Sequence, residues 1–324
     1  MEQSPMVTIL LPNYNNASYL KECIESILGQ TFQDFKLLII DDGSTDNSIE
    51  IIRSYNDDRF ELVLKEKNSG IVDSLNMGLD RINTKYVVRL DGDDLMSSDR
   101  IEILVNFMES HPEYGICGSD IQVFGADDFT MEFESDWQKN NANLIFFHSV
   151  GHASLIFRSS LFVEQGFRYS NEFKFMEDYD LLYRLKTVAK STSIPRPLYF
   201  YRYTERHEPV ASLEKKRLTY QRFYERILTD LGIDYPESDE IHLEISKNVK
   251  PKRKLLTYKR HLNLVEKAND EKKLFPQKEL KQVLKEYERR LVYRLADESN
   301  LSTAEALRYP FVWKYAIKAK SRKK

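Results

Sequence analysis

The sequence predicts an α/β fold in which a mostly parallel sheet is flanked by helices and followed by a helical C-terminal extension. Two observations support this prediction. Over residues 1–110, short apolar runs rich in β-branched residues alternate with apolar residues at helical spacing. After about residue 212 only the helical spacing continues. Regular alternation of strand and helix favours a parallel sheet that is covered on both faces.

The predicted elements of the first part follow from these patterns. Four apolar runs bounded by turn residues are predicted strands, at residues 7–11, 36–40, 60–64 and 86–90. Apolar side chains spaced by three or four predict helices at residues 20–28, 49–52, 71–82 and 101–108, with Asp46 as the expected N-cap of the second. Residues 111–175 are less regular, and a helix from Met176 and an aromatic strand at residues 195–203 follow.

Charge divides the chain into two regions. Residues 1–209 hold 20 basic and 34 acidic side chains, and residues 210–324 hold 28 basic and 17 acidic ones. We therefore expect one domain over residues 1–210, with halves at 1–110 and 111–210, and a basic helical region over 211–324. The basic helices suit either a subdomain with solvated faces or peripheral contact with an anionic membrane. Nucleic acid is disfavoured as a partner because no recognised nucleic-acid motif occurs.

The cysteines and the apolar runs bear on the compartment. Cys23 and Cys117 both fall in expected core elements and form no Cys-x-x-Cys pair, which suits free thiols in a reducing compartment. No secretory signal is visible, and no run reaches the roughly 20 apolar residues that span a bilayer. The expectation is a cytoplasmic protein, with any membrane contact being peripheral and on the inner face.

Polar clusters follow all four predicted strands of the first half. They occupy residues 13–16, 41–46, 68–70 and 91–94. In a parallel sheet the carboxyl ends of the strands share one edge, where ligands bind. Four polar loops at that edge predict a nucleotide-type pocket. A dinucleotide fold and a P-loop enzyme are disfavoured because neither glycine-rich motif is present.

The last of these clusters, Asp91-Gly92-Asp93-Asp94, places three carboxylates within four positions. Carboxylates this close repel one another unless a cation lies between them, and Mg²⁺ or Mn²⁺ prefers such oxygen ligands. Asp and Gly are also common turn residues, so a tight turn without metal is equally compatible with this stretch alone.

Two further groups are candidates for chemistry. His152 suits a structural histidine, and also a ligand to metal or phosphate or part of an acceptor pocket. Glu177, Asp178 and Asp180 open a predicted helix, where the helix dipole favours acidic residues. A carboxylate at this position would also serve as a general base toward a hydroxyl substrate. The aromatic strand at residues 195–203 suits either a core face or stacking against a sugar ring.

Several motifs in order resemble the family-2 nucleotide-sugar glycosyltransferases of bacterial surface polysaccharide synthesis. The resemblance covers roughly residues 6–205, and the C-terminal helices lie outside it. The motifs are Pro12-Asn13-Tyr14-Asn15, Gln30-Thr31-Phe32, Asp41 to Asp46, Asn68-Ser69-Gly70 with Asn76 and Gly78, Asp91 to Asp94, and Glu177-Asp178. The resemblance implies the GT-A fold, a Rossmann-like sheet flanked by helices, with a nucleotide-sugar half at 1–110 and an acceptor half at 111–210.

The same resemblance implies roles for individual residues. The nucleotide would contact residues that follow the first four strands: Pro12, Tyr14, Asn15, Asp42, Asn68 and Asp91. Asp93 resembles the ligand of Mg²⁺ or Mn²⁺, which bridges the donor diphosphate. Asp178 matches the general base, supported by Glu177, and the role of Asp94 stays open. His152 is a further candidate contact to metal or acceptor.

The expected activity is that of a metal-dependent hexosyltransferase. An inverting displacement would move a sugar from a nucleotide-diphosphate donor, expected to be a UDP-sugar, to a hydroxyl of a glycan or lipid-linked glycan in polysaccharide, O-antigen or capsule synthesis. Two alternatives stay open. A sugar nucleotidyltransferase shares the sheet and acidic ligands, but usually has a glycine-rich basic loop where this chain has Asn13–Asn16. A non-catalytic nucleotide-sugar-binding protein would retain the fold without needing both acidic motifs.

Overall fold

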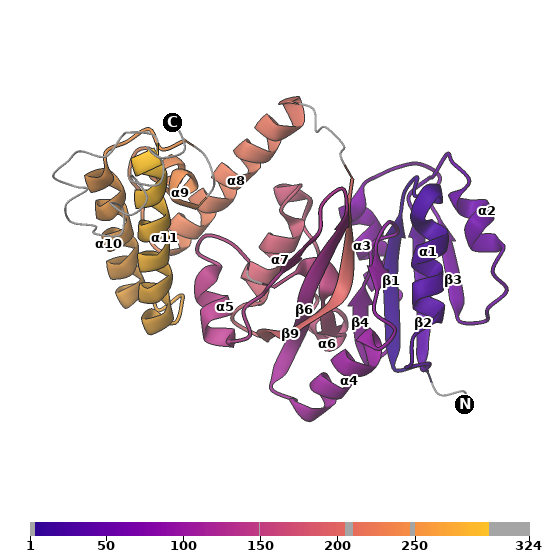
Figure 1. Cartoon of the computed structure of the whole chain (residues 1–324). Helices are drawn as coiled ribbons and strands as arrows, with labels where there is room; N and C mark the ends of the chain where they lie inside the picture. The colour runs from indigo at the N-terminus through magenta and orange to yellow at the C-terminus, as the bar shows by residue number, and fades with distance from the viewer. Residues whose placement is uncertain (1–3, 149, 205–209, 247–249, 298–324) are drawn as a thin grey trace. The chain divides into compact units, whose positions relative to one another are not determined.

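The computed structural model describes residues 4–148, 150–204, 210–246 and 250–297. The chain forms two compact units (Figure 1). The first comprises Met1–Asn140 and His148–Pro209, and the second comprises Asn141–Phe147 and Val210–Lys324. The short segment Asn141–Phe147, which lies within the expected acceptor half, therefore groups with the C-terminal helices. No helix of the described residues is both long enough and apolar enough to cross a bilayer.

The first unit is built on one sheet with the strand order β3-β2-β1-β4-β8-β6-β9-β5, and β7 pairs with β6. Its strands are β1 (Val7–Asn13), β2 (Phe35–Asp41), β3 (Phe60–Leu64), β4 (Tyr86–Arg89), β5 (Leu95–Met96), β6 (Tyr114–Gly125), β7 (Phe129–Met131), β8 (Ile156–Arg158) and β9 (Lys190–Tyr203). Strands β3, β2, β1 and β4 are parallel, as predicted. Beyond β4 the sheet is mixed, because β8 runs antiparallel to both β4 and β6 while β9 is parallel to β6.

Helices cover both faces of this sheet (Figure 1). The helices of this part of the chain are α1 (Ala17–Leu28), α2 (Ser48–Arg53), α3 (Ile71–Leu79), α4 (Arg100–Ser110), α5 (Trp137–Asn143), α6 (Ser160–Val163) and α7 (Glu177–Leu185), with 3₁₀ turns η1 (His152–Ser154) and η2 (Asn171–Phe173). One face packs the alternate β1 residues Val7, Ile9 and Leu11 against buried side chains of α1 and α4. On the other face Leu10 meets α3 at Gly78, where an added Cβ would lie 2.2 Å from Leu10 Cδ1.

Details of the prediction differ from the structure at three places. The N-cap of α2 is Asn47 rather than Asp46, although Asp46 Oδ1 accepts a hydrogen bond from the Ser48 amide. Helix α3 ends at Leu79, and Ile82 lies in the turn that follows. The longest strands, β6 and β9, fall wholly or partly outside the predicted strands, since β6 lies in the region expected to be irregular.

The second unit is helical, as expected for residues after 212. Its helices are α8 (Val210–Asp230), α9 (Ser238–Ser246), α10 (Leu255–Lys272) and α11 (Gln277–Asp297). The segment Asn141–Phe147 joins their core through Phe146, which is fully buried and stacks on His242 with 4.6 Å between ring centroids. Tyr224 of α8 donates a hydrogen bond of 2.7 Å to the Phe146 carbonyl.

Candidate active site

A cavity of about 240 Å³ opens at the carboxyl ends of β1 and β4. In the sheet, β2 lies on one side of β1 and β4 lies on the other. Strands are therefore added in opposite directions from β1, although all of them are parallel to it. Such a switch point leaves a crevice in which α/β proteins bind ligands. The cavity is lined by residues of all four polar clusters and of α3: Pro12, Asn13, Tyr14, Asn16, Asp42, Asn68, Gly70, Ile71, Ser74 and Asp91. The predicted convergence of the four loops is thus confirmed by geometry.

The floor of the cavity is held by a hydrogen-bond network between the first two loops. Asn13 Nδ2 donates to Asp41 Oδ2 at 2.7 Å, and Ser44 donates to the same carboxylate through its amide and its hydroxyl. Asn15 lies outside the cavity lining, and its Oδ1 accepts from the Thr45 amide at 2.8 Å. The structure therefore gives Asn15 a position that supports the loop, whereas Pro12 and Tyr14 face the cavity.

Asp42 joins the second loop to the third. Its carboxylate accepts hydrogen bonds from the amides of Ser69 (2.9 Å) and Gly70 (2.8 Å) and forms an ion pair with Lys65 at 2.5 Å. Asp42 is only 4% exposed, so these partners compensate its buried charge. The same contacts fix the loop that brings Asn68 to the cavity.

The acidic loop after β4 separates its three carboxylates. Asp91 lines the cavity and forms an ion pair with the buried Arg89. Asp94 points inward, where it is 1% exposed and accepts from Tyr199 Oη at 2.5 Å and from the Arg202 amide at 2.7 Å. Burial, reinforced by Asp91, raises the pKa of Asp94 to about 8. Asp94 is therefore mainly neutral near pH 7.

The loop has the charge that a divalent cation would relieve. Burial raises the pKa of Tyr201 on strand β9, and the nearby carboxyl groups of the acidic loop raise it further. Among the described residues no three His, Cys, Asp or Glu side chains are grouped so as to hold a metal by themselves. Mg²⁺ commonly uses one or two carboxylates and takes its other ligands from substrate phosphates and water. Asp91 and Asp93 fit a cation that is shared with a diphosphate.

Glu177 and Asp178 begin α7 and form a second carboxylate pair. The Asp178 side chain is 28% exposed, its Oδ1 accepts from the Tyr179 amide at 2.7 Å, and its Oδ2 lies 3.5 Å from His148 Nε2. Burial acts to raise the pKa of Asp178, but the surrounding polar groups, with His148 first among them and the Tyr179 amide and Arg89 included, lower it overall. Glu177 behaves oppositely, because burial and the charge of Asp178 raise its pKa.

His152 is influenced electrostatically by both carboxylate groups. Its Nε2 is hydrogen-bonded to Tyr169 Oη at 2.9 Å, and Tyr169 is held by reciprocal backbone hydrogen bonds with the Asn76 side chain. Burial and the charge of Arg89 lower the pKa of His152 to about 3, so the ring is neutral. Both Asp178 and Asp91 act electrostatically on this ring.

Arg89 connects the two groups. It is paired with Asp91, and its charge also acts to lower the pKa values of Glu177 and Asp178. Its Nε has no hydrogen-bond partner within the part of the chain that the structure describes, and the same is true of the buried Glu177 Oε2. Together these interactions place the carboxylates of the acidic loop and those of α7 in one polar site.

Sequence reasoning did not assign roles to Arg89, His148 and Tyr169. Arg89 directly precedes the acidic loop, so its position next to three carboxylates was a usable signal. His148 and Tyr169 reach the site only through the packing of an irregular region, and no local pattern marks them.

Comparison with known proteins identifies the first unit. Residues 8–162 match the family model described as glycosyl transferase family 2. The chain carries a family-2 glycosyltransferase domain. An uncharacterized glycosyltransferase of Haemophilus influenzae is 24% identical over 266 residues, which are 75% of this chain and 80% of that protein. Glycosyltransferase GlyG of Streptococcus pneumoniae is 37% identical over 103 residues, which are 31% of this chain and 34% of GlyG.

Solved structures agree on the fold. Residues 1–349 of TarS from S. aureus, in complex with UDP-GlcNAc, superpose with a TM-score of 0.62 at 18% identity and cover 91% of both chains. The mannosyltransferase PcManGT of Pyrobaculum calidifontis, in complex with GDP-Man and Mn²⁺, gives a TM-score of 0.52 at 16% identity, covering 82% of this chain and 74% of that one. The predicted GT-A fold is therefore confirmed, and the predicted family is supported by the match of residues 8–162.

Proposed function

We propose that this glycosyltransferase is an inverting, metal-dependent hexosyltransferase that uses a UDP-sugar donor and a hydroxyl acceptor. One observation carries the proposal. Arg89 and His152 connect the cavity at the β1/β4 switch point with Asp178, which is ionised and partly exposed. One carboxylate group faces a leaving group, and the other faces an acceptor. The binding of UDP-GlcNAc by the structural neighbour TarS supports a UDP-sugar as donor.

The nucleotide is proposed to occupy the cavity. Tyr14, which is 44% exposed, offers an aromatic face for the base, and Asp42, Asn68 and Asp91 offer polar groups for base and ribose. Asp93, together with Asp91, would hold Mg²⁺ or Mn²⁺, and the cation would neutralise charge on the departing diphosphate. The Mn²⁺ complex of PcManGT supports the use of a divalent cation.

Asp178 is proposed as the general base. It takes the proton of an acceptor hydroxyl while that oxygen attacks the anomeric carbon from the face opposite the diphosphate, and the single displacement inverts the configuration. A base must be ionised to act, and the lowered pKa of Asp178 ensures this at neutral pH. Glu177 is proposed to support Asp178 from the next position in the chain. His152 is proposed to contact the acceptor, and because its ring is neutral it would not repel a metal ion.

A glycan or lipid-linked glycan of the cell surface is the proposed acceptor class. The basic C-terminal region would bring the protein to the membrane that carries such a lipid, and the run Lys318–Lys324 on which this partly depends lies outside the described residues. Truncation after residue 310 is expected to weaken binding to anionic vesicles more than donor binding. Equal vesicle binding by both chains would contradict this part of the proposal.

The test of the function is a screen of nucleotide sugars with the full chain. UDP-glucose, UDP-galactose, UDP-N-acetylhexosamines and GDP-mannose are compared, with and without Mg²⁺ or Mn²⁺, for thermal stabilisation and for nucleotide release. Metal-dependent stabilisation by at least one UDP-sugar is expected. Failure of every donor to bind, or pyrophosphate release from a nucleoside triphosphate, would overturn the proposal.

A further inference from the structure

A distant strand holds the acidic loop that follows β4. Arg202 of β9 makes two hydrogen bonds to this loop. Its backbone amide donates to Asp94 Oδ1 at 2.7 Å, and its Nε donates to the Asp93 carbonyl oxygen at 2.9 Å. The short strand β5, which directly follows the loop, also pairs with β9, with Leu95 opposite Phe200. The shape of the acidic loop therefore depends on β9.

Other elements hold the Arg202 guanidinium in place. It lies over the ring of Tyr19 in α1 and over the ring of Phe124 in β6, at 4.8 and 4.6 Å from the two ring centroids. Its Nη2 donates to Glu22 Oε2 of α1 at 2.6 Å. The Arg202 side chain is only 15% exposed. A planar guanidinium that contacts two rings and a carboxylate has little freedom to turn, so its Nε stays directed at the Asp93 carbonyl oxygen.

The contact with Asp93 is the one that bears on the metal. Glu22 is 61% exposed, and solvent screens an ion pair of this kind, so the pair contributes little on its own. The hydrogen bond from Nε to the Asp93 carbonyl oxygen is more enclosed and has a charged donor, and such bonds are stronger than neutral ones. It anchors the main chain at the residue that carries the proposed metal ligand.

We propose that Arg202 positions Asp93 for the divalent cation by holding the Asp93 carbonyl group, so that the acidic loop has its binding shape before the metal and UDP arrive. The inference deepens the proposed function and rests on it, because it applies only if Asp93 binds the cation. Arg202 acts through the main chain of Asp93 and is a positioning residue. A loop that is ordered in advance loses less conformational entropy on binding, so the effect is expected in the metal-dependent affinity.

Two substitutions separate the position of Arg202 from its charge. Arg202→Lys keeps a positive charge on a long side chain but lacks the Nε–H that donates to Asp93. Arg202→Met removes the charge as well and keeps an unbranched side chain that can cover Tyr19 and Phe124. Positioning predicts a loss of metal-dependent affinity in both variants, whereas a purely electrostatic effect would appear in Arg202→Met alone.

Two matched variants remove neighbouring contacts. Arg196 also lies in β9, and its Nη2 pairs with Asp99 at 2.8 Å, outside the acidic loop. Arg196→Met therefore removes an arginine ion pair from the same strand without touching Asp93. Glu22→Gln removes the ion pair of Arg202 but leaves the hydrogen bond from Nε to Asp93 in place. Both variants are expected to keep the metal-dependent gain in UDP affinity of wild type.

Calorimetry measures UDP binding to the full chain with and without Mn²⁺, for wild type, Asp93→Asn and the Arg202, Arg196 and Glu22 variants. Mn²⁺ is expected to tighten UDP binding to wild type. In Arg202→Lys and Arg202→Met this gain should fall by about ten- to hundredfold, as is usual when a residue that supports a metal ligand is replaced. UDP affinity without Mn²⁺ should stay close to that of wild type, because Arg202 does not line the cavity.

Thermal denaturation without ligand checks that each variant is folded at the assay temperature, and Arg202→Lys decides the result if Arg202→Met is not. A wild-type gain in Arg202→Lys, or an equal loss of UDP affinity with and without Mn²⁺, would overturn the inference. If Asp93→Asn loses the gain while both Arg202 variants keep it, the inference fails and the proposed metal ligand stands. If Mn²⁺ does not tighten UDP binding to wild type, the metal dependence of the proposed function fails, and the role of Arg202 fails with it.

Discussion

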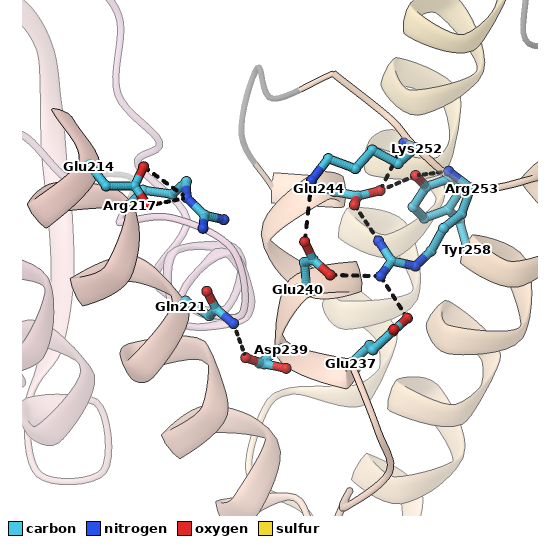
Figure 2. Close-up of polar contacts among 10 residues, drawn as sticks. All are labelled: Glu214, Arg217, Gln221, Glu237, Asp239, Glu240, Glu244, Lys252, Arg253 and Tyr258. Atoms are coloured by element: carbon cyan, nitrogen blue, oxygen red, sulfur yellow. Dashed lines mark hydrogen bonds and ion pairs between the residues drawn. The ribbon is translucent and has the colours of Figure 1, made fainter. Parts of the chain in front are cut away.

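Two arginines surrounded by carboxylates show how differently the two units use charge. In the helical unit Arg253 contacts Glu244 through Nη1 and Glu237 and Glu240 through Nη2, the latter two at 2.8 Å (Figure 2). Glu244 is completed by Tyr258 Oη and the Lys252 amide. In the glycosyltransferase domain Arg89 pairs with Asp91 but leaves Nε without a partner among the described residues.

The difference separates charges that stabilise a fold from charges that await a ligand. Buried polar atoms without partners are costly, so a fold retains few of them unless a ligand completes them. Arg89 Nε, Glu177 Oε2 and Asn13 Oδ1 are such atoms in the domain, and none is found on the described residues of α8 to α11. We therefore interpret the Arg253 cluster as structural and the Arg89 region as the candidate ligand site.

Removing the base should give the largest effect on activity. Asp178→Asn keeps the shape of the side chain but cannot accept a proton, so turnover should fall by about 10²–10⁴-fold. Donor affinity should stay within about twofold, because Asp178 lies outside the cavity lining. Steady-state UDP release and calorimetric donor binding check both statements. Glu172→Gln, an exposed carboxylate nearby in sequence, is the control and should change neither.

Breaking the closed cluster should act on stability instead. Arg253→Met leaves Glu244, which is 1% exposed, without its cation, and should cost about 3 kcal/mol of unfolding free energy. Arg217→Met is the matched control, because its pair with Glu214 is exposed and is worth at most about 1 kcal/mol (Figure 2). Hydrogen exchange of α9 and α10 in the full chain measures the difference. Equal costs for the two variants would show that the Arg253 cluster is not stabilising.

Two buried histidines of the helical unit should make it sensitive to acid. Tyr235 Oη, His261, His242 and the Ile145 carbonyl form a continuous hydrogen-bonded chain. Burial lowers the pKa of His242 to about 4 and that of His261 well below its usual value. The unfolded chain, with histidine pKa near 6.5, binds more protons between these values, so stability falls as pH drops from about 6.5 to 4.

For His242 alone this loss is roughly 3 kcal/mol. Hydrogen exchange of α9 and α10 as a function of pH, corrected for the intrinsic exchange rate, measures it. The slope should become shallower in His242→Gln and stay unchanged in His111→Gln. A slope that is the same in wild type and His242→Gln would contradict the assignment of a neutral buried ring.

The smallest effect is expected at Asp94. Because burial raises its pKa to about 8, Asp94 is neutral near pH 7, and Asn is a close mimic of the neutral acid. Asp94→Asn should therefore change donor affinity and turnover by less than about tenfold, since its amide can still bond Tyr199 and accept from the Arg202 amide. Measurement at pH 7 decides the point. A loss as large as that of Asp178→Asn would place Asp94 in the catalytic machinery.

The sequence predicted the parallel half of the sheet because its strands are buried on both faces and form continuous apolar runs. It missed β6, whose apolar residues are interrupted by Gly115, Gly118 and Ser119, and β8, which is only three residues long. These strands are stabilised by pairing with distant partners, so no local pattern marks them.

The site was predictable where residues follow a strand and hidden where they arrive by tertiary packing. The loops with Tyr14, Asp42, Asn68 and Asp91 meet because their strands are parallel neighbours. The resemblance assigned Asn15 to nucleotide binding together with these residues. In the structure Asn15 has a left-handed backbone, with φ 54°, and its side chain accepts a hydrogen bond from the Thr45 amide. The inward orientation of Asp94 depends on β9, and the contact of His148 with Asp178 depends on an irregular segment. Neither stretch has a regular hydrophobic periodicity from which the contact could be predicted.

The division of the polar site into a metal-binding part at Asp93 and a base at Asp178 is tested by UDP binding to wild type, Asp93→Asn and Asp178→Asn, measured by calorimetry with and without Mn²⁺. We expect Mn²⁺ to tighten UDP binding to wild type and to Asp178→Asn alike, and Asp93→Asn to lose this metal-dependent gain. Unchanged metal dependence in Asp93→Asn, or an equal loss in Asp178→Asn, would contradict the division of the site into a leaving-group side and an acceptor side.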